Sequence, residues 1–255
     1  MPRSEFDRIM NRWAALEEDI LARPWSWRGK DLTAREALYR TLEGEQEALV
    51  ATRLSARPSE PRLILSLAQR AFGDLRGLLV GLPGGMLDAA PAAGHWAVRQ
   101  TLAHMLAVER RYAVSTLHAA RRSDADPLRP PQADLDAASR VDDTGTVEDV
   151  LGRLGLARRE SDRLLGALPV DALTRPTDWA GYEVDVRFRL HRFAAHLVEH
   201  TVQCEKALRA LGRVEAEGRR IVRRIWATRG EHEALVAEGA LPALDAQVVE
   251  RAASL

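Results

Sequence analysis

Residues 193–206 read Phe-Ala-Ala-His-Leu-Val-Glu-His-Thr-Val-Gln-Cys-Glu-Lys and place two histidines one helical turn apart. His196 and His200 stand at positions i and i+4, which project from the same face of an α-helix. The other members of this face are apolar and recur at helical spacing: Leu190, Phe193, Leu197, Cys204, Leu208 and Leu211. The pattern is typical of a helix that buries two imidazoles inside a helical bundle.

Two interpretations of the histidine pair remain open at this level. Two imidazoles at this spacing can hold a single metal ion. They can also be satisfied by hydrogen bonds inside a bundle core, without a metal. A third ligand from another helix would favour the metal.

Most of the remaining chain also predicts helices. Capping boxes begin three of them, at Ser4, Thr33 and Thr146. The expected helices cover about residues 4–21, 33–56, 61–80, 97–121, 146–168, 186–211 and 214–228, and a short last helix begins near residue 241. No segment alternates as a strand does, so the sequence predicts an all-α fold.

The connection at residues 122–145 predicts the order of the helices in the bundle. It is rich in polar residues and proline, and it is long enough to span a helix. Such a crossover lets the helices before and after it run parallel. We therefore expect an up-down-down-up four-helix bundle at residues 59–212, a helical extension at 1–58 and another at 213–255.

Composition argues against several classes of protein. Lys plus Arg and Asp plus Glu each total 37, so the chain lacks the basic excess of nucleic-acid-binding proteins. No apolar run is long enough for a membrane span, and the first residues have no apolar signal-peptide core. The one cysteine excludes an internal disulfide. The sequence predicts a cytoplasmic protein that binds neither nucleic acid nor membranes.

A third histidine lies near the middle of the helix expected at 97–121. His104 shares its face with small side chains such as Ala97 and Thr101, which leave room beside it. If this helix adjoins the one with His196 and His200, the three imidazoles form one site. Three protein nitrogens with an open position are typical of a catalytic metal centre.

At these residues the sequence resembles the DinB-like superfamily of putative metal-dependent proteins. The resemblance covers about residues 61–212 and rests on two motifs and on the order of the helices. The motifs are Trp-x-Val-Arg-x-x-Leu-Ala-His at 96–104 and His-x-x-x-His-x-x-Gln at 196–203. The resemblance implies a divalent metal held by His104, His196 and His200, and zinc or nickel suits three imidazoles. It also implies a homodimer, because relatives are often dimeric.

The resemblance implies two kinds of function. The first is an enzyme whose metal activates a low-molecular-weight thiol or a water to attack a small-molecule substrate, as in thiol transferases and hydrolases. The alternative is a noncatalytic helical stress-response or binding protein with a structural metal or none. A fourth protein ligand would favour that alternative, and Cys204 is the obvious candidate, although its place in the apolar stripe favours packing.

Three polar residues near the histidines can each be interpreted in two ways. Glu199 is either a general base or a solvated surface carboxylate. Arg192 binds a carboxylate of the substrate or forms a surface salt bridge. Gln203 orients a ligand or makes an ordinary bond in the core.

Several other residues are expected at the surface of the protein or at an interface. His95, His118 and His232 have no partner pattern and are expected at the surface. The arginines of residues 213–224 favour a solvated helix over a nucleic-acid site. Trp13, Leu16 and Ile20 form an apolar face that either packs in a homodimer or folds back onto the same chain.

Overall fold

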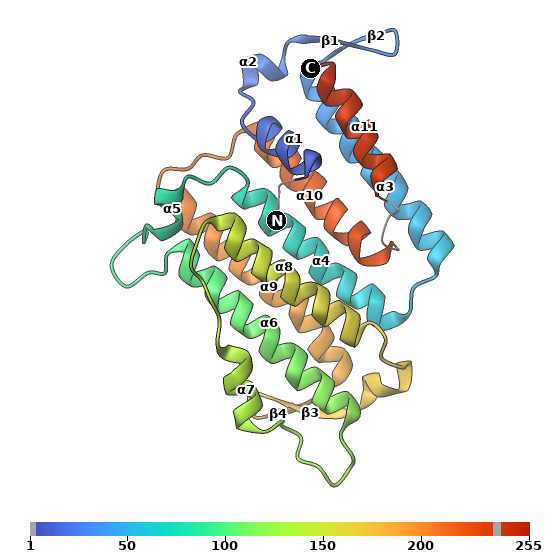
Figure 1. Cartoon of the computed structure of the whole chain (residues 1–255), viewed down its shortest axis with the longest axis vertical. Coiled ribbons are helices and arrows are strands. Elements are labelled where there is room, and N and C mark those ends of the chain that lie inside the picture. Colours follow the sequence, from blue (N-terminus) through green and yellow to red (C-terminus); the bar gives the residue numbers. More distant parts are fainter. Residues whose placement is uncertain (1–3, 237–240) are drawn as a thin grey trace.

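The computed structural model describes residues 4–236 and 241–255, and they are predominantly helical (Figure 1). The elements are α1 (Glu5–Ala14), α2 (Glu18–Leu21), β1 (Pro24–Trp27), β2 (Lys30–Thr33), α3 (Ala34–Ala56), α4 (Glu60–Leu79), α5 (Gly84–Asp88), α6 (Val98–Arg121), α7 (Gln132–Ser139), α8 (Val147–Leu165), a 3₁₀ turn η1 (Val170–Thr174), β3 (Pro176–Trp179), β4 (Tyr182–Asp185), α9 (Val186–Ala210), α10 (Glu217–Leu235) and α11 (Pro242–Ala253). The expected all-α class is confirmed.

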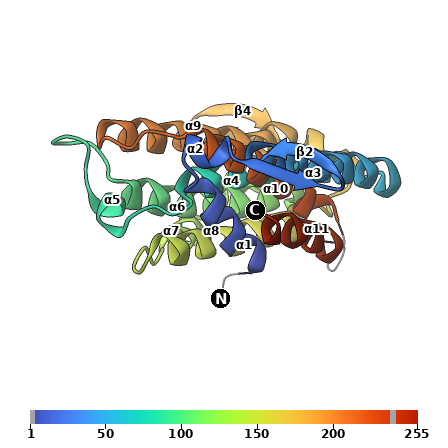
Figure 2. The ribbon, with the colours of Figure 1, turned by 90° about the horizontal axis from the view of Figure 1, so that it is seen from above.

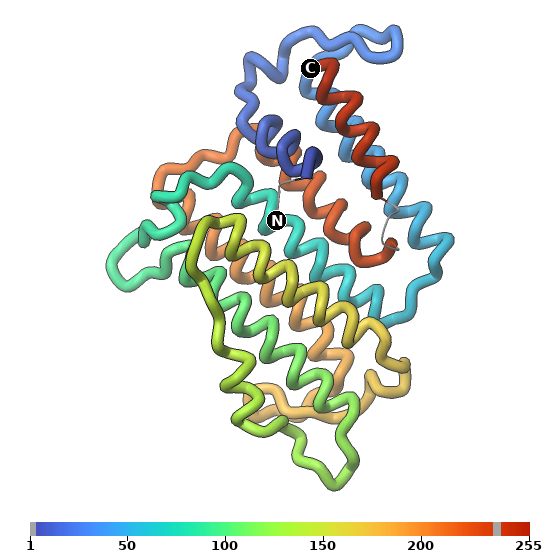
Figure 3. The backbone as a smooth tube through the Cα atoms, viewed as in Figure 1, coloured from blue at the N-terminus to red at the C-terminus, as the bar shows by residue number. Residues whose placement is uncertain are grey.

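Helices α4, α6, α8 and α9 form the predicted four-helix bundle. Helix α4 packs against α9, and α6 packs against both α8 and α9. Helices α6 and α8 run in the same direction, and the connection that contains α7 returns along the side of α6 before α8 begins (Figure 3). The up-down-down-up order is thus confirmed. The core of this bundle is aliphatic, with Leu75, Leu102, Leu154 and Leu190 fully buried.

Local capping sets where two of these helices begin. The Thr146 hydroxyl accepts a hydrogen bond from the Asp149 amide, and the Asp149 carboxylate accepts one from the Thr146 amide at 2.9 Å. Helix α9 begins after Asp185, whose carboxylate accepts from the Phe188 amide at 2.7 Å. These bonds satisfy amides that have no partner within the helix. The start of α9 in turn sets the angular position of the histidines further along it.

Two short β-hairpins were not expected from the sequence. Strand β1 pairs with β2, and β3 pairs with β4, in antiparallel two-stranded ribbons. Each turn has two residues with positive φ: Arg28 and Gly29 in the first, and Ala180 and Gly181 in the second. Such turns match the twist of a hairpin. Strands of four residues are too short for alternation to stand out, which is why the prediction of no strands was wrong.

The segments before and after the bundle pack together in a second apolar core. This core joins residues from α1, α3, α10 and α11, among them Trp13, Leu38, Val222 and Val248. Trp13 is 1% exposed. The apolar face that includes Trp13 and Leu16 therefore folds back onto its own chain, which was one of the two alternatives. A homodimer through another surface remains a prediction.

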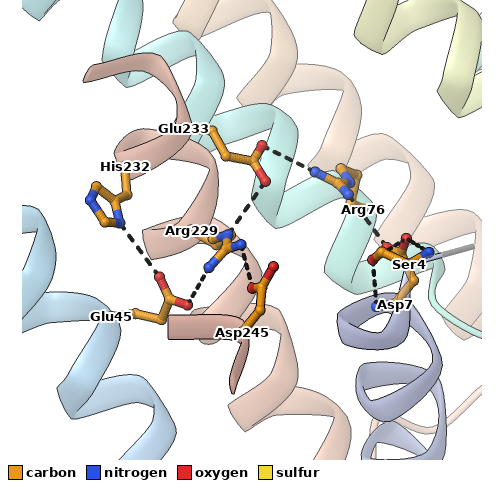
Figure 4. Close-up of polar contacts among 8 residues, drawn as sticks. All are labelled: Ser4, Asp7, Glu45, Arg76, Arg229, His232, Glu233 and Asp245. Carbon is orange, nitrogen blue, oxygen red and sulfur yellow. Dashed lines mark hydrogen bonds and ion pairs between the residues drawn. The ribbon is translucent and has the colours of Figure 1, made fainter. Parts of the chain in front are cut away.

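Helix α10 is buried along one side, contrary to the expectation of a solvated helix. Its arginines pair within the protein: Arg223 with Asp74, and Arg229 with Glu45 and Asp245 (Figure 4). His232, expected at the surface, is 3% exposed, and its Nε2 lies 3.0 Å from the Thr52 hydroxyl. The sequence shows the charges of these arginines but not the carboxylates that pair with them, so the helix resembles a solvated one. Inside the fold, ion pairs satisfy those charges.

Helices α4 and α10 lie in contact along the middle of the molecule and join the two cores. The backbones approach closely at Gly73 and Gly230. A methyl group at Gly73 would collide with the Trp226 carbonyl, and one at Gly230 would collide with the Gln69 carbonyl. Viewed from above, α9 and α3 lie on one side of this central pair and α8, α1 and α11 on the other (Figure 2). Among the residues that the structure describes, no helix has the length and apolarity needed to cross a membrane.

Candidate metal centre

Three histidines from two antiparallel helices meet on the side of the bundle. His104 comes from α6, and His196 and His200 come from α9. The Nε2 atoms of His104 and His196 are 3.2 Å apart, and a nitrogen of each ring lies within 4.8 Å of one on the others. The two α9 imidazoles are buried, whereas His104 is half-buried. The structure thus brings together the three residues predicted from the sequence.

The donor set fits a divalent cation. Zinc–imidazole bonds of about 2.05 Å at tetrahedral angles require nitrogens about 3.3 Å apart. The 3.2 Å separation between His104 and His196 matches this value. Burial and the two neighbouring imidazoles lower the pKa of His196 to about 3, and burial lowers that of His104. Both rings are therefore neutral at physiological pH, as metal ligation requires.

Gln203 determines which nitrogen of His200 is available. The Gln203 Oε1 atom lies 2.7 Å from His200 Nδ1, so Nδ1 carries the proton and donates it to the amide oxygen. The lone pair is then on Nε2. A hydrogen bond on the far nitrogen is how proteins commonly orient a metal-ligating imidazole. The structure accordingly places Gln203 as a direct hydrogen-bonding partner of His200.

Cys204 is not placed as a fourth ligand. Its side chain is fully buried in the bundle core, and burial raises the pKa of its thiol to about 12, partly offset by a hydrogen bond with Thr101. A ligating cysteine is a thiolate. A metal held by the three imidazoles would therefore keep a coordination position for a molecule from solution.

An aromatic and cationic wall, which we define as Tyr112, Trp179 and Arg192, lies beside the histidines. The Tyr112 ring is 5.5 Å from the His196 ring and 5.0 Å from the Trp179 ring. The Arg192 guanidinium lies 5.1 Å from the Trp179 ring centre. Burial raises the pKa of Tyr112, and hydrogen bonding to Arg192 partly offsets this rise. Tyr112 therefore presents a neutral hydroxyl next to a fixed positive charge.

The β3–β4 hairpin holds this wall in place. Arg189, one turn before the wall on α9, donates to the Thr177 hydroxyl at 3.0 Å and to the Asp178 carbonyl. Its guanidinium also lies 5.4 Å from the Trp179 ring centre. The sequence reasoning missed Tyr112 because it stands two turns from His104 in a stretch with no motif. Its spacing of eight residues from His104 on one helix was the only available signal.

Glu199, the remaining predicted site residue, and Trp96 lie near His104. Glu199 is exposed, with its Oε2 atom 3.7 Å from Arg192 Nη2, and its charge opposes the lowering of the His104 pKa. The Trp96 ring lies 5.2 Å from the His104 ring. Tyr182 is exposed at the hairpin turn, and His191 points to solvent. The half-buried His104 is the most exposed of the three histidines, and we call its side of the site the opening.

Comparisons with known proteins agree with this fold. The four-helix protein YfiT from Bacillus subtilis is described as a probable metal-dependent hydrolase with an unusual four-helix bundle topology. The two structures align with a TM-score of 0.50, and the aligned residues are 17% identical. The alignment covers 61% of this chain and 91% of YfiT, and at this identity it supports the fold alone. No curated protein matches the sequence. The DinB superfamily matches residues 67–204, more than half of the chain, and this protein therefore belongs to the DinB superfamily.

Proposed function

We propose that the protein is a metal-dependent enzyme that activates a water or a low-molecular-weight thiol for attack on a small molecule. The observation that carries the proposal is the convergence of ring nitrogens of His104, His196 and His200 within 4.8 Å of one another, with burial lowering the pKa of His104 and of His196. The description of YfiT as a probable metal-dependent hydrolase supports the hydrolytic form. A divalent cation at such a site lowers the pKa of the water or thiol that it binds, which supplies a nucleophile near neutral pH. Zinc and nickel suit the imidazole donors.

The residues around the histidines supply the remaining steps of such a reaction. Arg192 binds a carboxylate or another anionic oxygen of the substrate, since Tyr112 and Trp179 fix its guanidinium beside the site. Gln203 keeps His200 in the tautomer that presents Nε2. Glu199, at the opening, accepts a proton from the nucleophile and releases it to solvent. Trp96 and Trp179 exclude water from the two ends of the site.

The noncatalytic alternative in its form with a structural metal calls for a closed coordination sphere. Cys204 was the candidate for closing it, but its thiol is protonated and directed into the core. An open position favours catalysis over a structural role.

Metal analysis of the purified protein tests this proposal. We expect about one divalent ion per chain, lost in single His→Ala variants at positions 104, 196 and 200 that keep a helical circular-dichroism spectrum. His191→Ala is the matched control, because that residue is exposed on the same helix. Full occupancy in the His196→Ala, His200→Ala double variant would rule out the site.

The catalytic part is tested on metal-loaded and chelator-treated protein. Ester and amide hydrolysis and the transfer of small thiols to electrophiles are followed in parallel. We expect one of these activities to require the metal and to fall at least 100-fold in His200→Ala. The Arg192→Gln variant should raise KM for anionic substrates with metal content unchanged. Equal rates with and without metal would contradict an enzymatic role for this centre.

A further inference from the structure

A hairpin followed by a long helix occurs twice in the chain. Residues 23–29 read Arg-Pro-Trp-Ser-Trp-Arg-Gly, and residues 175–181 read Arg-Pro-Thr-Asp-Trp-Ala-Gly. Each segment forms a first strand and a two-residue turn with positive φ, and each second strand leads directly into a helix, α3 or α9. The Arg23 carbonyl accepts from the Ala34 amide at 2.9 Å, and the Arg175 carbonyl accepts from the Val186 amide at 3.1 Å.

The same ion pair ties each of these helices to a neighbour. Arg187, the second residue of α9, donates to Glu60, the first residue of α4, with 2.6 Å between Nε and Oε1. Arg35, the second residue of α3, donates to Glu217, the first residue of α10, with the corresponding atoms 2.7 Å apart. Helix α3 therefore corresponds to α9, and α10 corresponds to α4.

The remaining helices complete the correspondence. Helix α1 begins with a capping box between Ser4 and Asp7, just as α8 begins with one between Thr146 and Asp149. Each of these helices precedes a hairpin. Helix α11 follows α10 as α6 follows α4, and it packs against α1 and α3 as α6 packs against α8 and α9. The second apolar core is thus the core of a second four-helix bundle, built from the two ends of the chain.

The two bundles are related by an approximate two-fold axis. Gly73 of α4 abuts the Trp226 carbonyl of α10, and Gly230 of α10 abuts the Gln69 carbonyl of α4. If Glu60 is equivalent to Glu217, Gly73 corresponds to Gly230 and Gln69 corresponds to Trp226. Rotation about the two-fold axis therefore turns each of the two contacts into the other. This reciprocity is the property of an isologous interface. The hairpins accordingly lie at opposite ends of the molecule (Figure 1).

The second bundle lacks the metal ligands. With Thr33 equivalent to Asp185 at the helix starts, Gly44 and Ala48 of α3 occupy the positions of His196 and His200. Gln247 of α11 lies next to Gly44, as His104 of α6 lies next to His196. The Oε1 atom of Gln247 is 3.9 Å from the position that a Cβ atom would take at Gly44. The Arg251 guanidinium lies 3.7 Å from the same point. A positive charge thus occupies the space where the first bundle would hold a cation.

We propose that residues 4–56, 217–235 and 242–253 form a second metal-centre bundle that has lost its ligands and now serves as the built-in partner of the first. The surface of α4 that packs against α10 is therefore already covered by a copy of the same fold within the chain. The protein then binds one metal ion rather than two, and it is a monomer in solution. The homodimer predicted from the sequence becomes unnecessary for covering this surface.

Measurements of the mass and the metal content of the full chain test the partner role of the second bundle. Light scattering at tens of micromolar should give the mass of one chain, and metal analysis should give one ion that His196→Ala removes. A stable homodimer would overturn the built-in partner. A second ion that survives His196→Ala but is lost on changing Gln247 would overturn the loss of ligands. A monomer that takes up no metal would refute the proposed function while leaving the partner role intact.

Rebuilding the second site tests the correspondence of the residues. The variant Gly44→His, Ala48→His, Gln247→His, Arg251→Val introduces three ligands and removes the competing charge. Val108 stands at the position equivalent to Arg251, four residues after the ligand on α6. We expect two ions per chain, against one in a control that carries only Arg251→Val. A variant with the native melting profile and a single ion would overturn the equivalence of these positions. If the variant does not fold, the double change Gly44→His, Ala48→His is assayed for a second, weaker cobalt site, and its absence counts against the proposal.

Discussion

The Nδ1 atom of His200 donates a hydrogen bond to the Oε1 atom of Gln203, one turn further along α9, at 2.7 Å. This bond selects the tautomer with its lone pair on Nε2, which leaves that nitrogen able to bind a metal. We expect Gln203→Leu to weaken metal affinity by about 10- to 100-fold, as loss of such partners does in metal centres. Gln203→Glu keeps an acceptor and should retain affinity. Competition with a chromophoric chelator measures both, and an unchanged affinity in Gln203→Leu would show that the bond is not needed.

The metal-free protein should lose stability as the pH falls below neutrality. The pKa of His196 is about 3 in the folded protein, below its ordinary value, because burial and the neighbouring imidazoles disfavour the cation. The unfolded chain therefore binds a proton between about pH 6.5 and pH 3 that the folded chain does not, so stability falls with pH across this window by up to about 1.4 kcal/mol per unit. Urea unfolding at several pH values measures the slope. The His196→Leu variant should have a shallower slope, and parallel curves would contradict the assignment.

Cys204 should behave as a packing residue. Its buried thiol has a pKa near 12, so it should react with a disulfide reagent only after unfolding. Cys204→Ala should keep the metal and lower the free energy of unfolding by about 1 kcal/mol. Loss of metal from a folded Cys204→Ala variant would instead make the thiol a ligand.

The buried ion pair between Glu45 and Arg229 should be costly to break. The two side chains are 1% and 5% exposed, with 2.9 Å between Oε1 and Nη1 (Figure 4). Glu45→Ala leaves a buried guanidinium with only Asp245 and Glu233 as partners, so we expect a loss of about 3 kcal/mol in the free energy of unfolding. The control is Glu43→Ala, which breaks an exposed pair with Arg40 and should cost less than about 0.5 kcal/mol. Similar losses for the two variants would contradict this difference.

The protein should not bind duplex DNA. The formal net charge is zero, and the arginines Arg213, Arg219 and Arg223 around α10 contact the Val80 carbonyl or carboxylates of the same chain. Little of the charge that nonspecific binding requires is therefore available. Fluorescence anisotropy with a labelled duplex at low and physiological salt measures the interaction. Salt-sensitive binding at submicromolar protein would contradict this expectation.

The sequence predicted the first bundle well because its signals are strong and local. Long amphipathic stripes, capping residues such as Thr146 and the crossover at 122–145 each specify an element or a direction. His104, His196 and His200 were predicted together because they belong to the two motifs at residues 96–104 and 196–203. Tyr112 carried no such signal, since its role depends on Trp179 in a distant hairpin.

The second bundle escaped prediction for a different reason. Its halves lie at opposite ends of the chain, so no continuous segment has the length or the pattern of a bundle. Its capping boxes and the Arg-Pro-x-x-Trp-x-Gly segments are the repeated signals, and each is short. Buried polar side chains such as those of Arg229 and His232 also resemble surface residues until their partners are known.

The division of the second bundle between the two ends of the chain has a consequence for synthesis. Helix α3 ends at Ala56, whereas α10, its partner across the second core, begins only at Glu217. At about 5–20 residues per second, a ribosome needs roughly 8–30 s to reach α10 after finishing α3. During that interval Trp13 and Leu38, buried in the finished protein, have no partner helix to cover them. The nascent chain therefore presents an uncovered apolar surface while the first bundle is still being made.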